Sequence, residues 1–327
     1  MSAIFFVMLM KLCITNKIPT AANAAEQTRA RYLMGTVCEI TAHGPGAEAG
    51  LEATFSEIER IESILSTYRD RSELSRLNRE ASPRPLRVSR TLWDALSRAV
   101  RLSRASSGAF DPTFASPPRS RGFDRIHMHP RTRSVRLDPG TIVRLDAFAK
   151  GYALDRAAAL LRAKGVDSAL LNFGGQILAL GSPPKASAWP VDLAPPDCPP
   201  RGDPRISPAR CGRPSLKLFL KDASISTSGS SEQGDHIVDP ATGGRVRRKS
   251  SLAVVSPSAA DADAWSTALF VRGLSDLPKA FSACALELTP LSAGSRTDFA
   301  GRCDSLLREG RMSFPTDENI ATKETHP

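Results

Sequence analysis

The sequence predicts an α+β fold, a class in which helices and strands mix without regular alternation. Segments with the apolar spacing of helices and segments rich in β-branched residues both occur along the chain. They do not follow the steady strand–helix–strand order that a doubly wound sheet requires. The chain has 327 residues, of which 41% are hydrophobic, and its apolar runs stay shorter than the ~20 residues of a membrane-spanning helix. We therefore expect a soluble globular protein with a large core.

Three segments carry apolar residues at the spacing of an amphipathic helix. The first covers residues 47–65, and the second begins after Ser89, a hydroxyl residue suited to capping a helix N-terminus. The third runs from about Ala149 to Lys164 and stops at Gly165, a favourable C-terminal cap. These segments supply the helical part of the predicted fold.

Strand-like segments make up the other part of the predicted fold. They are Tyr32–Thr41, Ser134–Leu137, Ile142–Leu145, Ala169–Leu171, Ile177–Leu180, Leu216–Leu220 and Leu252–Val255. Because a turn sequence, Asp138-Pro139-Gly140, separates the second segment from the third, we expect these two to form a β-hairpin.

The ends of the chain and one internal stretch differ in composition from the rest. The first residues contain the apolar run Ala3–Met10 and the small-x-small site Ala22-Asn23-Ala24, which favours a signal peptide over residues 1–25. We expect one folded domain over 26–300, with a Pro-rich insertion at 182–214 and an irregular tail at 301–327. The predicted localisation is periplasmic or otherwise exported, and a cytoplasmic protein with a ragged start site is the alternative.

Charge and cysteine content narrow the classes of function. The chain carries 44 Lys and Arg against 34 Asp and Glu, a net charge of +10. The arginines are scattered and form no recognisable nucleic-acid module, so we expect no nucleic-acid partner. The cysteines at 13, 38, 198, 211, 284 and 303 include no Cys-x-x-Cys pair, which argues against a zinc knuckle or a thioredoxin-like centre. Structural thiols are favoured, and Cys198 with Cys211 is the alternative disulfide pair.

Several motifs suggest phosphate and metal chemistry. Lys150 stands at the start of a predicted helix, where backbone N–H groups and an ammonium group favour an anion. Asp263 and Thr267 are four residues apart, so on a helix their oxygens share one face and suit Mg²⁺. His236, in a predicted turn, has a side chain that moves a proton near neutral pH. Taken singly, each has a structural alternative: a solvent-facing lysine, a helix cap and a turn histidine.

Taken together and in order, these segments resemble the ApbE family of flavin transferases, which are FAD:protein FMN transferases. The resemblance runs from about Tyr32 to Gly273 and is most specific at Ala149–Tyr152, His236–Gly243 and Ala262–Leu269. It implies an α+β architecture with a T-fold-like core and a cleft for FAD. It also implies transfer of the FMN half of FAD to a threonine hydroxyl of an acceptor flavoprotein, with release of AMP.

The resemblance assigns roles to individual residues. Those implied for FAD binding are Met34, Tyr68, Ala109, Phe110, Asp111, Lys150 and Leu252. The implied Mg²⁺ ligands are the side chains of Asp263 and Thr267 and the backbone carbonyl of Ala147, and His236 matches the catalytic histidine. The sequence departs from the family pattern at several points. Arg144 stands where many members have an acidic residue, Asp146 stands where a small residue is common, and residues 230–235 lack the tyrosine often seen after the Thr-Ser-Gly turn.

The expected mechanism is a phosphoryl-type transfer in which FAD is a substrate. His236 would take the proton of the acceptor threonine, and Lys150 would stabilise the developing negative charge. The expected partners are FAD and an acceptor flavoprotein, with possible association with membrane-bound redox complexes. Two alternatives remain open: a metal-dependent FAD pyrophosphatase, in which water replaces the threonine, and a non-catalytic FAD-binding protein.

Overall fold

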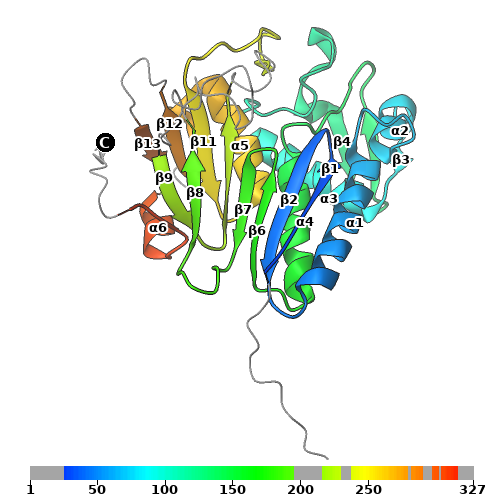
Figure 1. Ribbon diagram of the computed structural model, residues 1–327. Helices are drawn as coiled ribbons and strands as arrows, with labels where there is room; N and C mark the ends of the chain where they lie inside the picture. The colour runs from blue at the N-terminus through cyan, green and yellow to red at the C-terminus, as the bar shows by residue number, and fades with distance from the viewer. Residues whose placement is uncertain are drawn as a thin grey trace, which may run out of the picture.

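The computed structural model describes residues 26–194, 216–229, 237–278, 281–289, 297–301 and 303–315. Its centre is an eight-stranded sheet in which all neighbouring strands are antiparallel. Helices pack on one face of this sheet, and a smaller sheet packs on part of the other face (Figure 1). The α+β class predicted from the sequence is confirmed.

The large sheet has the strand order β1-β2-β6-β7-β10-β11-β12-β13. These strands are β1 (Glu26–Leu33), β2 (Thr36–His43), β6 (Ser168–Phe173), β7 (Gln176–Leu180), β10 (Ala223–Ser228), β11 (Ser251–Ser256), β12 (Cys284–Leu288) and β13 (Thr297–Gly301). The sequence predicted one strand over Tyr32–Thr41, whereas the structure interrupts it with a two-residue turn at Met34 and Gly35.

Two three-stranded sheets complete the β-structure. One has the order β14-β9-β8, from Met312–Ser313, Leu216–Leu220 and Trp189–Leu193, and the other has the order β3-β5-β4, from Leu86–Arg87, Ser134–Leu137 and Ile126–His129. The predicted hairpin of Ser134–Leu137 with Ile142–Leu145 is wrong, because β5 pairs with β4, which precedes it, and residues 142–145 form no strand. The backbone after Asp138 instead makes a tight turn, in which the N–H of Thr141 donates to the carbonyl of Asp138 at 3.0 Å.

The helices are α1 (Ala47–Leu65), α2 (Glu73–Glu80), α3 (Arg90–Ala105), α4 (Ala149–Ala163), α5 (Ala259–Arg272) and α6 (Cys303–Arg308). Three confirm the predicted segments, caps included. The side chain of Ser89 accepts a hydrogen bond from the N–H of Leu92 at 3.2 Å, and Gly165 takes the positive φ of +76° that a glycine after a helix commonly adopts. None of the helices in the described ranges combines the length and hydropathy of a membrane-spanning segment.

The large sheet separates two hydrophobic cores. One lies between the sheet and helices α1, α3, α4 and α5, and the other lies between β10–β12 and the sheet β14-β9-β8. Because β11 contacts both cores, all six of its residues are buried. A strand covered on both faces has no polar–apolar alternation, so its sequence cannot show which side chains face which core.

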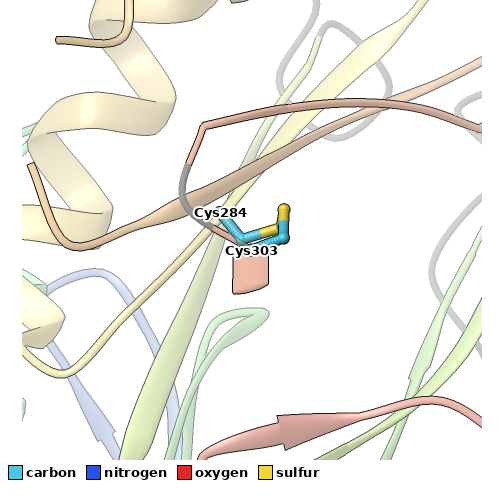
Figure 2. Close-up of a disulfide and its surroundings, with 2 residues drawn as sticks. All are labelled: Cys284 and Cys303. Atoms are coloured by element: carbon cyan, nitrogen blue, oxygen red, sulfur yellow. A yellow bond between two sulfur atoms is a disulfide. The ribbon is translucent and has the colours of Figure 1, made fainter. Parts of the chain in front are cut away.

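A disulfide connects the end of the chain to the large sheet. Cys284 in β12 bonds to Cys303 at the start of α6 (Figure 2), so the expectation of structural thiols is wrong for this pair. Burial raises the pKa of the remaining described cysteine, Cys38, to about 12. The alternative pair, Cys198 with Cys211, lies outside the described residues.

The predicted domain boundaries need adjustment near the C-terminus. The helix α6 and the strand β14 fall within residues 301–327, which the sequence placed in an irregular tail, and β14 pairs with β9. The strand β8 falls within the predicted insertion 182–214, most of which lies outside the described residues, as does the predicted signal peptide.

Candidate active site

A cavity of about 850 Å³ lies at the end of the large sheet where the β1–β2 and β6–β7 turns meet the N-terminal part of α4. Its wall also includes the end of β10, part of α5, the segment after α1 and the segment after α3. Segments distant in sequence therefore converge on one site, which no single motif defines.

Two tight hairpin turns form one rim of the cavity. Met34 and Gly35 both have positive φ angles, of 46° and 79°, as do Gly174 and Gly175, of 59° and 84°. This is the backbone twist that two-residue hairpin loops require. The two turns touch, since a Cβ atom on Gly174 would lie 2.7 Å from the side chain of Thr36. Met34 is not a residue that favours positive φ, so the backbone is strained where it borders the cavity.

The crossing of α4 and α5 forms the floor of the cavity. A Cβ atom on Gly151 would lie 2.2 Å from the carbonyl oxygen of Ala259, so only glycine permits this approach of the two helices. The carboxylate of Asp155 in α4 fixes the start of α5, accepting a hydrogen bond from the N–H of Ala259 at 2.7 Å. As a result, Asp263, one turn into α5, lies against the start of α4.

Asp263 is the buried charge of the site. Its Oδ2 accepts a hydrogen bond from the N–H of Gly151 at 3.1 Å, and its Oδ1 accepts one from Ser226 at 3.5 Å. Burial raises the pKa of the Asp263 carboxyl, while the nearby ammonium of Lys150 opposes that rise. Only 5% of the residue is exposed, so its charged form would gain strongly from a cation in the cavity.

Hydroxyl groups surround this carboxylate. The Oγ of Ser266 donates to the backbone carbonyl of Asp263 at 3.0 Å and lies 2.9 Å from the Oγ of Ser228 and 3.3 Å from that of Ser226. The Oγ1 of Thr267 lies 3.4 Å from the Oγ of Ser228. We call the part of the cavity formed by these residues the hydroxyl end; its members are Lys150, Ser226, Ser228, Asp263, Ser266 and Thr267.

Another part of the cavity wall is aromatic, and Arg144 organises it. Its Nη2 donates to the hydroxyl of Tyr68 at 2.6 Å, and its Nε lies 2.6 Å from a carboxylate oxygen of Asp146. The guanidinium carbon lies 5.3 Å from the ring centroid of Tyr68 and 5.6 Å from that of Phe114. We call this part of the cavity the aromatic end; its members are Tyr68, Phe110, Phe114, Arg144 and Asp146. Arg144 thus holds the ring of Tyr68 through a hydrogen bond and through its charge.

Asp111 lines the cavity and also stabilises a loop. Its Oδ1 accepts hydrogen bonds from both the N–H and the hydroxyl of Thr113, each at 2.7 Å. Burial raises the pKa of Asp111, and the hydrogen bonds from Thr113 and Phe123 oppose that rise. The carboxyl therefore stabilises the loop that presents Phe110 to the cavity.

The oxygen atoms at the hydroxyl end suit a magnesium ion. Among the described residues no group of three or more His, Cys, Asp or Glu side chains is placed to hold a metal. Asp263, Thr267 and Ala147 all line the cavity, and they carry a carboxylate, a hydroxyl and a backbone carbonyl. Mg²⁺ prefers such oxygen ligands and usually completes its shell with water and substrate phosphate, so this sparse set fits it.

The cavity collects most of the residues that the sequence singled out. Those that line it are Met34, Tyr68, Ala109, Phe110, Asp111, Ala147, Lys150, Asp263 and Thr267. Leu252 does not line it, because it is fully buried in β11. His236 lies outside the described residues, but Ile237 and Val238, which follow it, line the cavity.

Gln176 is a cavity residue that the sequence analysis missed. Its Nε2 donates to the carbonyl of Ala259 at 2.8 Å, which fixes the orientation of the amide. Its Oε1 is buried and has no hydrogen-bond partner among the described residues. One sequence feature could have identified it: Gln176 is a polar residue directly after Gly174-Gly175, at the start of a segment that is otherwise apolar. An unpaired buried acceptor costs stability, so a ligand that donates to Oε1 would stabilise the site.

Fold and cavity together define an α+β protein whose cavity is lined by a lysine, a buried carboxylate and aromatic rings. Comparison with known proteins gives the family. The model of the ApbE family matches residues 34–287. A FAD:protein FMN transferase of Treponema pallidum is 30% identical over 317 residues, covering 82% of this chain and 84% of the relative. One from Salmonella typhimurium is 26% identical, covering 78% and 81%. The chain belongs to the ApbE family.

Solved structures of ApbE proteins have the same fold as this chain. The ApbE protein of Thermotoga maritima superposes with a TM-score of 0.73 at 22% identity, covering 86% of this chain and 99% of its own. The flavin transferase ApbE of Vibrio cholerae superposes with a TM-score of 0.71 at 24% identity, covering 85% and 97%. At such identities the likeness concerns the fold.

Proposed function

We propose that this enzyme transfers the FMN half of FAD to a threonine hydroxyl of an acceptor flavoprotein and releases AMP, in a reaction that depends on Mg²⁺. One observation carries the proposal: a buried carboxylate among hydroxyls and a lysine at one end of a cavity whose other end is aromatic. The family and the names of its curated relatives support FAD as the substrate.

In this reaction one bond to phosphorus replaces another. The oxygen of the acceptor threonine attacks the FMN phosphorus, the bond from that phosphorus to the bridging oxygen breaks, and AMP leaves with the bridging oxygen. The threonine proton goes to a base, for which we propose His236. The position of its neighbours Ile237 and Val238 in the cavity wall supports this role.

The residues at the hydroxyl end would serve the pyrophosphate. Asp263, Thr267 and the carbonyl of Ala147 would hold Mg²⁺, which neutralises phosphate charge when bound. Lys150 would stabilise the negative charge that develops on the transferred group. At the aromatic end, Tyr68 and Phe110 would contact the rings of FAD. Asp111 would act chiefly through the loop that it stabilises.

Mass spectrometry of an acceptor tests the proposal. The chain is incubated with FAD, Mg²⁺ and a purified flavoprotein subunit of a membrane-bound redox complex. The expected result is an added FMN mass on one threonine and an equal amount of AMP. His236→Ala should retain FAD binding within a few-fold while transfer falls roughly 10²–10⁴-fold, the usual contribution of a positioned base. Free FMN without modified acceptor would instead establish a pyrophosphatase, and FAD binding without AMP release a binding protein.

We also propose that the chain is exported and meets its acceptor outside the cytoplasmic membrane. The apolar run and the small-x-small site in residues 1–25 support this. N-terminal sequencing of the protein from its native host should then begin near Ala25. A chain that begins at Met1 or Ser2 would contradict export.

A further inference from the structure

Most of the exposed large apolar side chains are close in sequence to residues that line the cavity. The described part of the chain has five large hydrophobic residues in the exposed class: Tyr32, Val37, Tyr68, Ile142 and Leu307, which are 74%, 54%, 79%, 40% and 37% exposed. Tyr68 lines the cavity, and the next three each lie within two residues of a lining residue. Only Leu307, in α6, is remote from the lining segments. Apolar residues scattered singly over a surface need no explanation, but this concentration does.

Tyr32 and Val37 form a pair on the β1–β2 hairpin. They are direct cross-strand partners that flank the turn at Met34 and Gly35. Partners directly opposite in an antiparallel ladder share a face, with side chains close enough to form one surface. The next pair, Arg31 with Cys38, faces the helices, because Cys38 is buried and Arg31 lies over the ring of Phe55 in α1. Tyr32 and Val37 therefore occupy the outer face of the sheet.

No described element covers that outer face at the hairpin. The sheet β14-β9-β8 packs on the outer face of β10, β11 and β12, where the second hydrophobic core lies. Figure 1 shows this sheet at the far side of the molecule from β1 and β2. The apolar pair is therefore available to a partner beside the turn that lines the cavity.

We propose that Tyr32, Val37 and Ile142, here called the rim patch, bind the acceptor flavoprotein. This inference rests on the proposed function and specifies its partner surface. In the proposed function FAD would occupy the cavity, and the three residues of the rim patch lie outside the residues that line it. The transfer requires a second macromolecule to bring a threonine hydroxyl into the same opening. Buried aromatic and aliphatic anchors commonly dominate the energy of such interfaces, and the rim patch provides them where the acceptor must lie.

The acceptor surface that fits the rim patch is apolar and lies next to the modified threonine. Contact through the rim patch would hold the acceptor while its threonine enters past the Met34-Gly35 turn. A pyrophosphatase has no need of this surface, because water is its acceptor. The rim patch thus favours a protein acceptor.

The test is a double variant, Tyr32→Thr with Val37→Thr, which keeps the strand propensity of both positions. The matched control is Leu307→Gln, which removes the one exposed apolar side chain of this set that is remote from the cavity. The probe is the flavoprotein subunit modified in the transfer experiment. We expect the KM for the acceptor to rise about tenfold in the double variant, since the anchors of an interface carry most of its binding energy. The dissociation constant for FAD should stay unchanged, and the control should behave like the parent protein.

The outcomes separate this inference from the proposed function. If the parent protein modifies no acceptor, the proposed function fails. If the parent protein modifies the acceptor and the double variant has an unchanged KM, the rim patch is not the binding surface. Parallel losses of FAD affinity and acceptor affinity would also overturn it, because they would place the pair in the FAD site. Ile142→Thr, on a separate segment, gives an independent reading if the double variant folds poorly, and its KM should rise as well.

Discussion

The two ends of the cavity are built on different physical principles. At the hydroxyl end, Asp263 is held by backbone and hydroxyl donors at a helix crossing that only Gly151 permits. At the aromatic end, Tyr68 is 79% exposed and is held by one arginine. The first arrangement belongs to the core, whereas the second combines a buried ring, Phe110, with the exposed ring of Tyr68.

This difference indicates how each end contributes. Groups that are buried and fixed before the substrate arrives can stabilise a developing charge without reorganisation, which is the most effective form of catalysis. Exposed side chains lose conformational entropy when they close on a ligand. We therefore expect substitutions at the hydroxyl end to change the rate of transfer, and those at the aromatic end to change affinity by small factors.

The largest effect expected is that of Asp263→Asn. Loss of the carboxylate should lower transfer at least about 10²–10³-fold, the scale for removing one electrostatic contact from an active site. The control is Asp261→Asn in the same helix, whose carboxylate lies 3.6 Å from Arg98 and does not line the cavity. Transfer rates measured by AMP release should separate the two variants. Comparable activity in both would remove Asp263 from the chemistry.

The same variant, Asp263→Asn, should also be more stable than the parent protein, because the buried charge that serves transfer lowers the free energy of unfolding. Burial raises the pKa of Asp263 in the folded state, so the folded protein binds this proton more tightly than the unfolded chain. Stability therefore falls as the pH rises from the unfolded value of about 3.9 through the raised pKa of the folded state. Asparagine carries no charge, so in EDTA at pH 7 Asp263→Asn should unfold at a higher temperature than the parent protein. Below about pH 4 the difference should vanish.

Sequence reasoning identified residues of the cavity wall where helical spacing and a family resemblance agreed. Asp263 and Thr267 are one helical turn apart, and the structure places both in the cavity wall. Lys150 at a helix start was found by the same reasoning. Local periodicity sufficed for Asp263 and Thr267 because one helix, α5, presents both.

It failed where the decisive contact lies elsewhere in the chain. Met34 is not a turn residue by type, so a continuous β-like pattern concealed the turn between β1 and β2. The spacing of cysteines does not define their partners, so the Cys284–Cys303 bond was missed. Leu252 matched a binding position but is buried in a strand covered on both faces, which periodicity cannot orient.

An intermediate effect is expected at Gln176, which is bonded to Ala259 at the floor of the cavity. If a ligand donates to its unpaired Oε1, Gln176→Met should raise the dissociation constant for FAD about threefold to tenfold, the equivalent of one neutral hydrogen bond. Ser224→Ala is the matched control, because it removes a buried hydrogen bond of 2.6 Å to the carbonyl of Ile177 and does not line the cavity. Titration of FAD fluorescence measures both. Equal affinities in Gln176→Met and the parent protein would show that the ligand leaves Oε1 unpaired.

The smallest effect is expected at the aromatic end, from Tyr68→Phe. This change removes the hydrogen bond from Arg144 and keeps the ring, and the pair is exposed, so the loss should be about 0.5 kcal/mol, or roughly twofold in FAD affinity. Tyr32→Phe is the control, an exposed tyrosine outside the cavity lining. The rate of transfer at saturating FAD should not change, since the hydroxyl of Tyr68 is bonded to Arg144 rather than to a residue that we expect to hold the pyrophosphate. A fall in that rate of tenfold or more would mean that Arg144 and Tyr68 act on the pyrophosphate themselves, and the division of the cavity into a catalytic end and an affinity end would be wrong.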